Sequence, residues 1–185
     1  MISTIRQVLL IALAFFTSSG LALPLKTDYS RSMVSAVFRQ MNVPVEARFM
    51  KFNATIDFDA GKPESARANV SIDIPSFDLG DPDYNREVQK KEWFDGAAYP
   101  KANFVSGKIR AGTAGKLEVT GKLTIKGKQT DVSFPLTLKK EGALQVFEGS
   151  IPIKRLFFSI GDGEWKDTSI VADEVIIKFR VFAGQ

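Results

Sequence analysis

The stretch Asn85–Ser106, NREVQKKEWFDGAAYPKANFVS, interrupts a chain in which apolar and polar residues otherwise alternate. Residues 86–92 are mostly helix formers, and the aromatic pair Trp93-Phe94 follows them. Pro100 then sets a turn, and alternation resumes at Ala102. We therefore predict one or two helical turns, a packed aromatic plug, a kink and a return to strand. A single helical interruption among strands suits the cap or wall of a barrel.

Strands flank this stretch on both sides. Apolar residues recur at every second position, as in Ala66–Ile74, ARANVSIDI, and turn residues separate the segments at hairpin spacing. A leading segment at 23–31 precedes the first strand, and Pro135 predicts an edge or a bulge. About eight strands result, and they indicate an antiparallel barrel or sandwich. The predicted strands cover 32–40, 45–59, 66–74, 103–110, 116–126, the region of 132–138, 144–154 and the region of 175–181.

Composition removes much chemistry. The chain has 185 residues, a formal net charge of +4, no cysteine and no histidine. Its length suits one folded domain, here 23–185. Imidazole or thiolate catalysis and metal ligation by these groups are excluded, which lowers the case for an enzyme. The positive charges form no basic run, so nucleic acid is not expected as a partner.

The N-terminus predicts a cleaved secretory signal peptide over residues 1–22. Arg6 is its only charged residue, Val8–Phe16 is an unbroken apolar run, and Gly20-Leu21-Ala22 places small residues at a cleavage site. Nine apolar residues are too few to span a bilayer. We therefore expect a secreted protein whose mature chain begins near Leu23.

Other motifs favour ordinary structural roles. Asp57 and Asp59 end a predicted strand, and Asp81 and Asp83 flank a proline in a turn, where aspartate is common. A calcium site or an acid–base pair is the alternative for these carboxylates, whereas Asp162, Glu164 and Asp167 lack the spacing of a known calcium loop. The fifteen phenylalanines are more informative, because they suit either a filled core or a cavity for a long apolar ligand. Composition does not decide between these two.

Several segments, in their order and spacing, resemble the YceI-like family of secreted, polyisoprenoid-binding proteins with a lipocalin-like barrel. The match covers most of the mature chain. Ala47 and Ala54 stand where glycine is expected, which would narrow the barrel locally, and Lys126 stands where many relatives have histidine. Because Lys126 lies in a turn, we expect it to affect the pocket little. The matching segments are Ser32–Ser35 with Phe38, Val43–Glu46 with Phe49 and Phe52, Ile72–Ser76, Trp93–Asp95 with Tyr99, Pro100, Ala102, Phe104 and Ser106, Gly121–Gly127, Ile153 with Arg155, Phe158 and Gly161, and Asp173–Val175.

The resemblance implies an all-β, lipocalin-like, eight-stranded antiparallel barrel with one short helical segment between strands. It also implies a periplasmic protein without catalytic residues, metal or resident cofactor, which holds a polyprenyl phosphate or an isoprenoid quinone. The candidate pocket consists of apolar residues from the predicted inner faces together with the aromatic pair. These residues are Val34, Ala36, Phe38, Phe49, Phe52, Ile56, Val70, Ile72, Ile74, Trp93, Phe94, Phe104, Leu117, Val119, Leu123, Phe134, Leu136, Ile177 and Phe179.

Three functions remain open from the sequence. The first is carriage, storage or protection of a linear isoprenoid, with a membrane b-type cytochrome or another quinone enzyme as a possible partner implied by the resemblance. The second is a small lipid-modifying enzyme that works with carboxylates or lysine. The third is a structural or interaction barrel with a filled core and no ligand. The chain is expected to be a monomer or a homodimer.

Overall fold

A computed structural model describes residues 24–184 of the chain, and the predicted signal peptide lies outside this range. The described residues form a single antiparallel sheet of ten strands and one α-helix. The strands are β1 (Pro24–Gln40), β2 (Val43–Phe49), β3 (Phe52–Asp57), β4 (Arg67–Asp73), β5 (Phe77–Asp78), β6 (Lys101–Ala111), β7 (Leu117–Ile125), β8 (Lys128–Glu141), β9 (Leu144–Lys154) and β10 (Val171–Gly184), and the helix is α1 (Pro82–Glu87).

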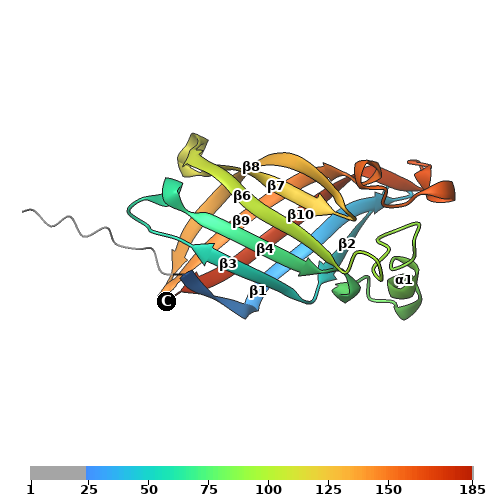
Figure 1. The fold of residues 1–185 in the computed structure, drawn as a ribbon, viewed down its shortest axis with the longest axis horizontal. Coiled ribbons are helices and arrows are strands. Elements are labelled where there is room, and N and C mark those ends of the chain that lie inside the picture. Colours follow the sequence, from blue (N-terminus) through green and yellow to red (C-terminus); the bar gives the residue numbers. More distant parts are fainter. Residues whose placement is uncertain (1–23, 185) are drawn as a thin grey trace, which may run out of the picture.

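The sheet closes into a barrel. β10 pairs with β9 on one side and with β1 on the other. β2 and β3 both pair with β1, so they act as two halves of one barrel strand. With that pair counted once and the two-residue β5 left out, eight strands form the wall, which confirms the predicted eight-stranded antiparallel barrel. Figure 1 shows an elongated barrel with α1 and its following loop at one end and the last residues of β10 at the other.

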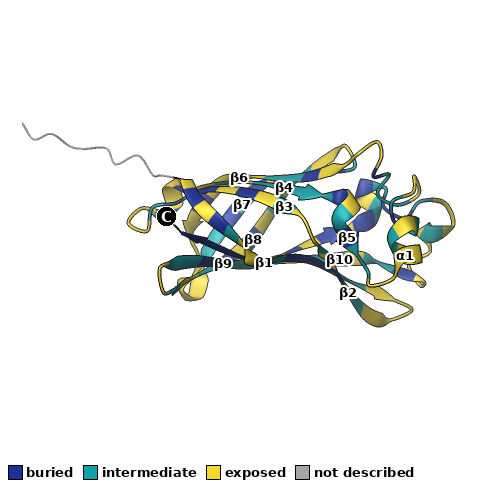
Figure 2. Cartoon of the chain, turned by 90° about the horizontal axis from the view of Figure 1, so that it is seen from below, coloured by how far each residue is buried: buried dark blue, intermediate teal, exposed yellow. Residues whose placement is uncertain are grey.

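The period of two along each strand builds the interior. In β7, Val119, Gly121, Leu123 and Ile125 are buried, and the residues between them are more exposed. The alternating residues therefore meet in one core along the barrel axis, while their neighbours face water. Figure 2 shows buried segments along the strands and exposed residues in the loops at both ends. β9 has the bounds predicted from the sequence, and β4 lies within the predicted range.

The first strand is longer than predicted, because residues of the predicted leading segment 23–31 belong to β1. The register between β1 and β10 shifts between Asp28 and Met33. Asp28 Oδ1 accepts hydrogen bonds from the backbone N–H groups of Ser30 and Arg31, which holds a bulge. The bulge breaks the alternation, and the strand pattern was therefore hidden on its N-terminal side.

The helical interruption exists, but the helix begins earlier than predicted. α1 covers Pro82–Glu87 rather than 86–92, and turns without regular helix follow it. The Asp81 side chain accepts from the N–H groups of Asp83 and Tyr84, and proline occupies the first helical turn. We interpreted these residues as a loop, although aspartate before proline is also a helix-start signal. No helix among residues 24–184 is long and apolar enough to cross a membrane.

Two further irregularities shape the wall. The predicted strand at 45–59 is divided at Met50 and Lys51, whose N–H groups donate to the backbone and side-chain oxygens of Ser76. Pro135 lies where β8 stops pairing with β9: their ladder ends at Leu136 and Gly149, while β8 continues beside β7. Pro135 therefore marks the start of an unpaired strand edge, as predicted, although β8 lies inside the barrel wall.

Candidate ligand-binding cavity

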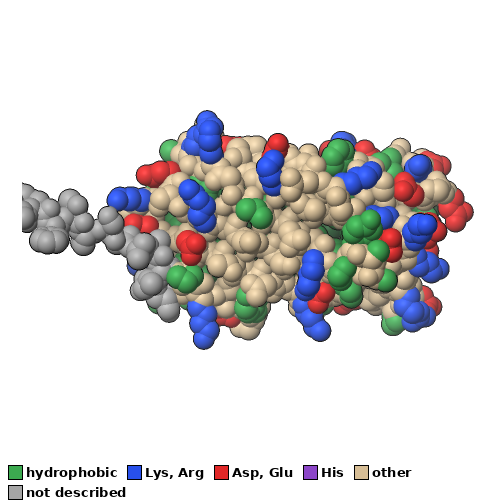
Figure 3. All heavy atoms as spheres, in the orientation of Figure 1, with side chains coloured by type: hydrophobic (Ala, Val, Ile, Leu, Met, Phe, Trp, Pro, Cys, Tyr) green, Lys and Arg blue, Asp and Glu red, His purple; other side chains and the backbone are tan. Residues whose placement is uncertain are grey.

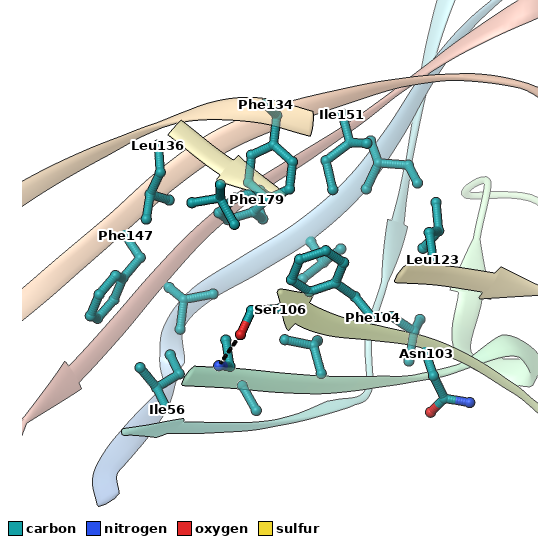
Figure 4. A pocket seen from close by; sticks show the side chains of 18 of the residues that line it. Ile56, Asn103, Phe104, Ser106, Leu123, Phe134, Leu136, Phe147, Ile151 and Phe179 are labelled. Carbon is teal, nitrogen blue, oxygen red and sulfur yellow. Dashed lines mark hydrogen bonds between the residues drawn. The ribbon is translucent and has the colours of Figure 1, made fainter. Parts of the chain in front are cut away.

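An apolar cavity follows the inside of the barrel. Its lining includes most of the residues predicted for the pocket. They come from β1, β2, β3, β4, β6, β7, β8 and β10, together with residues that follow β4 and α1. Figure 4 shows several of them pointing toward one another. These predicted lining residues are Val34, Phe49, Ile56, Val70, Ile72, Ile74, Phe94, Phe104, Leu117, Val119, Leu123, Phe134, Leu136, Ile177 and Phe179.

Four predicted pocket residues do not line the cavity. Ala36 is buried in a second cluster with Ala47, Phe77 and Val88, near α1. Phe38 pairs with Val45 and Val175 near the β1–β2 turn, outside the lining.

Phe52 and Trp93 are the other two. Phe52 packs edge-on against Tyr29, with ring centroids 5.4 Å apart. Trp93 lies in the aromatic plug at the end of the barrel and contacts Trp165, with centroids 5.3 Å apart. Alternation identifies a face of a strand but not how far along the barrel each residue lies, which explains these differences.

Other lining residues were not among the predicted set. Ala54 lies on the inner face of β3 with Ile56, and Phe58 directly follows β3, so the same alternation identifies both. Ile109 was hidden by the register shift between Ser106 and Ile109, which moves it out of phase with Phe104. The remaining additions are Ala66, Arg67, Ala68, Ala102, Asn103, Ser106, Ile125, Phe147, Ile151 and Val181.

Three phenylalanines cross the interior. The rings of Phe104 and Phe134 lie 5.6 Å apart, and those of Phe134 and Phe179 lie 5.7 Å apart. Two glycines make room for them, because a Cβ on Gly121 would lie 2.5 Å from the Phe104 ring and one on Gly149 would lie 2.6 Å from the Phe179 ring. These rings narrow the interior, whose cavity volume is about 150 Å³. Small-molecule sites commonly measure about 300–1,000 Å³, so this interior is a narrow passage.

Polar groups are scarce in the lining. Arg67 is the one ionisable residue among the lining residues, and its Nη1 donates to the carbonyls of Ser65 and Ala66. Ser106 Oγ accepts from the N–H of Ala68, as drawn in Figure 4, whereas the Asn103 side chain points away from the others. Within residues 24–184, no group of three metal-ligating side chains lies together. The cavity can therefore hold an apolar chain by excluding water, but it offers no acid–base pair.

An aromatic plug closes the end of the barrel beside α1. Phe94 contacts Phe77 and Phe49, with ring centroids 5.3 and 6.4 Å apart. Phe94 also lines the cavity, whereas Trp93 packs behind it against both buried clusters. The sequence left open whether this pair fills the barrel end or faces a ligand. The structure gives the two residues different positions, with only Phe94 at the cavity.

Arg155 fixes the turns behind the plug. Its side chain is almost fully buried and donates to five backbone carbonyls. Burial lowers the pKa of its guanidinium, and the carboxylates of Asp173 and Asp162 oppose that shift. The guanidinium also lies over the Trp93 ring, 5.9 Å from its centroid. The five carbonyls belong to Ile160, Gly161, Trp165, Val171 and Ala172.

The barrel and its apolar lining agree with a family match. The model of the YceI-like domain matches residues 25–183. The chain belongs to the YceI-like family. This confirms the resemblance found in the sequence.

Curated YceI-like relatives share parts of their length with this chain. A UPF0312 protein of Pseudomonas syringae pv. tomato is 30% identical over 98 residues, which cover 53% of this chain and 51% of that protein. Protein YceI of Salmonella newport is 28% identical over 133 residues, 70% of this chain and 67% of that protein. The chain thus spans about half the length of the Pseudomonas relative that it matches.

Solved YceI-like structures share the barrel. BcnA of Burkholderia cenocepacia has a TM-score of 0.83 and 53% identity, over 85% of this chain and 99% of that chain. A polyisoprenoid-binding domain from Saccharophagus degradans has a TM-score of 0.67 and 18% identity, over 89% and 98% of the two chains. At 18% identity, the second comparison supports the fold alone.

Lys126 has a larger role in this YceI-like chain than its turn position indicated. Its Nζ donates to the carbonyls of Lys91 and Trp93, at 2.7 and 2.6 Å, and to that of Ser159 at 2.7 Å. It therefore joins the plug to the turn after β9. Burial lowers the pKa of its ammonium group, while nearby carboxylates, with Asp162 first, oppose the shift.

We predict that Lys126→Met lowers the free energy of unfolding by about 1–2 kcal/mol, because three carbonyls lose a charged donor. Amide hydrogen exchange should quicken over residues 89–96, and urea unfolding gives the stability. Lys128→Met is the matched control, since Lys128 Nζ donates to Ser159 Oγ and to no plug carbonyl. Equal exchange rates in the plug of both variants would contradict a fastening role for Lys126.

Proposed function

We propose that this protein binds a linear isoprenoid lipid, such as an isoprenoid quinone or a polyprenyl phosphate, inside the barrel. The observation that carries the proposal is the continuous apolar lining, which reaches from Phe94 at the plug to Phe58 near the opposite end. Each 100 Å² of apolar surface removed from water stabilises a complex by about 2.5 kcal/mol. The same barrel fold occurs in a polyisoprenoid-binding domain, and that ligand class is the one we propose for this chain.

We further propose that the protein is secreted to the periplasm after removal of residues 1–22. The charge-poor N-terminus with its apolar run supports this location. A binding protein is favoured over an enzyme, because the lining holds Arg67 as its one ionisable residue and that group bonds its own backbone neighbours. Carriage to a quinone enzyme, such as a membrane b-type cytochrome, is a use that fits this ligand.

The small volume of the cavity favours one competing function, a filled structural barrel without ligand. An interior of about 150 Å³ is narrow even for a slim chain. Native mass spectrometry of protein purified from a periplasm separates the two functions. The proposal expects a bound mass that organic solvent removes. A filled barrel expects the apoprotein mass and no binding of added short-chain ubiquinone.

Ala54→Phe tests whether the ligand occupies the barrel. Ala54 is buried in the lining, so a ring there would take the space of the lipid chain. We expect at least about a tenfold loss of ubiquinone affinity, with an overpacking cost of about 1–3 kcal/mol in stability. Thr55→Phe adds a ring on the neighbouring, exposed position and is the control. Unchanged affinity in folded Ala54→Phe protein would place the ligand elsewhere.

A further inference from the structure

The wall of the barrel is incomplete between β8 and β9. Their ladder runs from the pair Glu141 and Leu144 to the pair Leu136 and Gly149. Beyond it, residues 128–134 pair only with β7, and residues 151–154 pair only with β10. No hydrogen bond joins these two segments to each other in the part of the chain that the structure describes. We name this part of the wall, residues 128–134 and 151–154, the β8–β9 window.

Two prolines weaken any extension of the ladder across the window. A two-residue turn joins β8 to β9, so Glu141 and Leu144 form a hydrogen-bonded pair, and every second pair after it does the same. Continued in this register, the hydrogen-bonding positions include Pro135 opposite Ser150 and Pro152 opposite Ser133. Neither proline has an N–H to donate. Each of these pairs can therefore make at most one of its two hydrogen bonds, so the sequence disfavours pairing of the strands here.

Elsewhere in the wall, side chains close similar irregularities with hydrogen bonds. Between β1 and β3, Thr27 Oγ1 donates to the carbonyl of Ala54, and the N–H of Ala54 donates to the Tyr29 hydroxyl. Between β4 and β6, Ser106 Oγ accepts from the N–H of Ala68. These two places are closed by polar contacts that would have to break before the strands could part.

Apolar side chains alone close the window. Phe134, Ile151 and Ile153 are buried, while Ser133 and Pro152 are exposed on the outer surface, where water can solvate unpaired backbone groups. Phe134 and Ile151 also line the cavity, and Figure 4 shows both side chains directed into it. Separation of the strands at this place breaks no ladder hydrogen bond and leads directly into the interior.

The ends of the barrel are closed more firmly than the window. The aromatic plug fills one end, and at the other the buried rings of Phe58 and Phe147 meet edge to face, 5.4 Å apart. Lys126 and Lys128 bond Ser159 and so connect the β7–β8 turn to the turn that follows β9. The window thus has a ladder at one limit and a pair of lysine contacts at the other.

We propose that the lipid enters and leaves sideways, through the β8–β9 window, rather than through an end of the barrel. This rests on the proposed function. A long chain that enters an end must thread its whole length past the plug or the Phe58–Phe147 pair. A lateral opening admits it beside the cavity after Phe134 and Ile151 move apart.

A reversible crosslink tests the route. The chain has no cysteine, so Ser133→Cys with Pro152→Cys supplies the only two thiols, at positions that face each other in the continued register. The pair is closed by oxidation or, where the strands stand too far apart for a disulfide, by a short bifunctional thiol reagent. Short-chain ubiquinone is mixed with the full-length mature protein, and tryptophan fluorescence gives association and dissociation rates.

The closed pair should slow both rates by about tenfold or more, because a gating step limits exchange, while the equilibrium affinity changes little. For the disulfide form, reductant should restore the rates. The control pair Thr137→Cys with Glu148→Cys crosslinks residues that are already paired, and its rates should not respond to closure. Unchanged rates with the window closed overturn the lateral route and leave the proposed function intact. Failure of ubiquinone to bind in either state overturns the proposed function itself.

Discussion

Replacing Arg155 with Met should lower the free energy of unfolding by about 3 kcal/mol or more, since each buried carbonyl left without a donor costs about 1–3 kcal/mol. The side chain is 2% exposed and holds five carbonyls from the turns behind the plug and the start of β10. In a chain of this size each kcal/mol corresponds to about 2–4 °C in melting temperature. Thermal unfolding should therefore shift down by about 6 °C or more.

The controls separate geometry from charge. Arg155→Lys keeps the charge but has three donors on one atom, so it cannot reach five divergent acceptors and should restore only part of the loss. Lys154→Met removes a neighbouring charge that is exposed and should change the melting temperature little. A melting temperature of Arg155→Met that equals that of Lys154→Met would show that water replaces the guanidinium without cost.

The two plug aromatics should differ when each is replaced with Ala. Each change should cost about 3–5 kcal/mol of stability, as is typical of large-to-small changes in packed aromatic sites. Phe94→Ala should also speed ubiquinone dissociation, because Phe94 lines the cavity and its loss opens the plug end. Trp93→Ala should leave dissociation unchanged in the folded fraction, because Trp93 packs behind the lining against Trp165.

Melting curves of the lipid-free proteins, together with dissociation rates from stopped-flow mixing, check both changes. The rates can be followed with the fluorescence of Trp165 when Trp93 is absent. Equal dissociation rates for Phe94→Ala and Trp93→Ala would contradict the assignment of Phe94 alone to the cavity. Faster dissociation in Trp93→Ala would place its ring against the ligand despite its position in the structure.

Most strands and their inner faces could be predicted from the sequence because apolar residues alternate with polar ones along each strand. A residue such as Val119 or Ile177 has one face to occupy, and alternation identifies that face. Alternation fails to identify the inner face where a bulge adds a residue to one strand and shifts the register. The bulge after Asp28 concealed half of β1, and the shift after Ser106 concealed Ile109.

Positions along the barrel axis were beyond prediction. Ala36 and Ile177 are paired neighbours on β1 and β10, yet only Ile177 lines the cavity. The position of a residue along the barrel axis depends on the stagger of its strand and on the residues that close each end of the barrel. Both are set by contacts between residues that are distant in the sequence. Arg155 shows the same limit, because its five acceptors come from turns and from the start of β10, which no local pattern brings together.

One face of the molecule carries charges of both signs. On the face drawn in Figure 3, basic and acidic side chains are interspersed over the barrel, without a field of one sign. This agrees with the absence of a basic run in the sequence.

The rings over Gly121 and Gly149 have a consequence for which lipids can be distinguished. The rings of Phe104 and Phe179 occupy the space that side chains at Gly121 and Gly149 would fill. The width of the cavity here is therefore set by these two rings, and neither glycine has room for a methyl group. A lining with almost no polar groups cannot recognise a head group, but it can exclude ligands that are wider than the cavity. Flexible isoprene chains of different lengths and different ends should therefore compete for the same barrel, whereas the rigid fused rings of a sterol should be rejected.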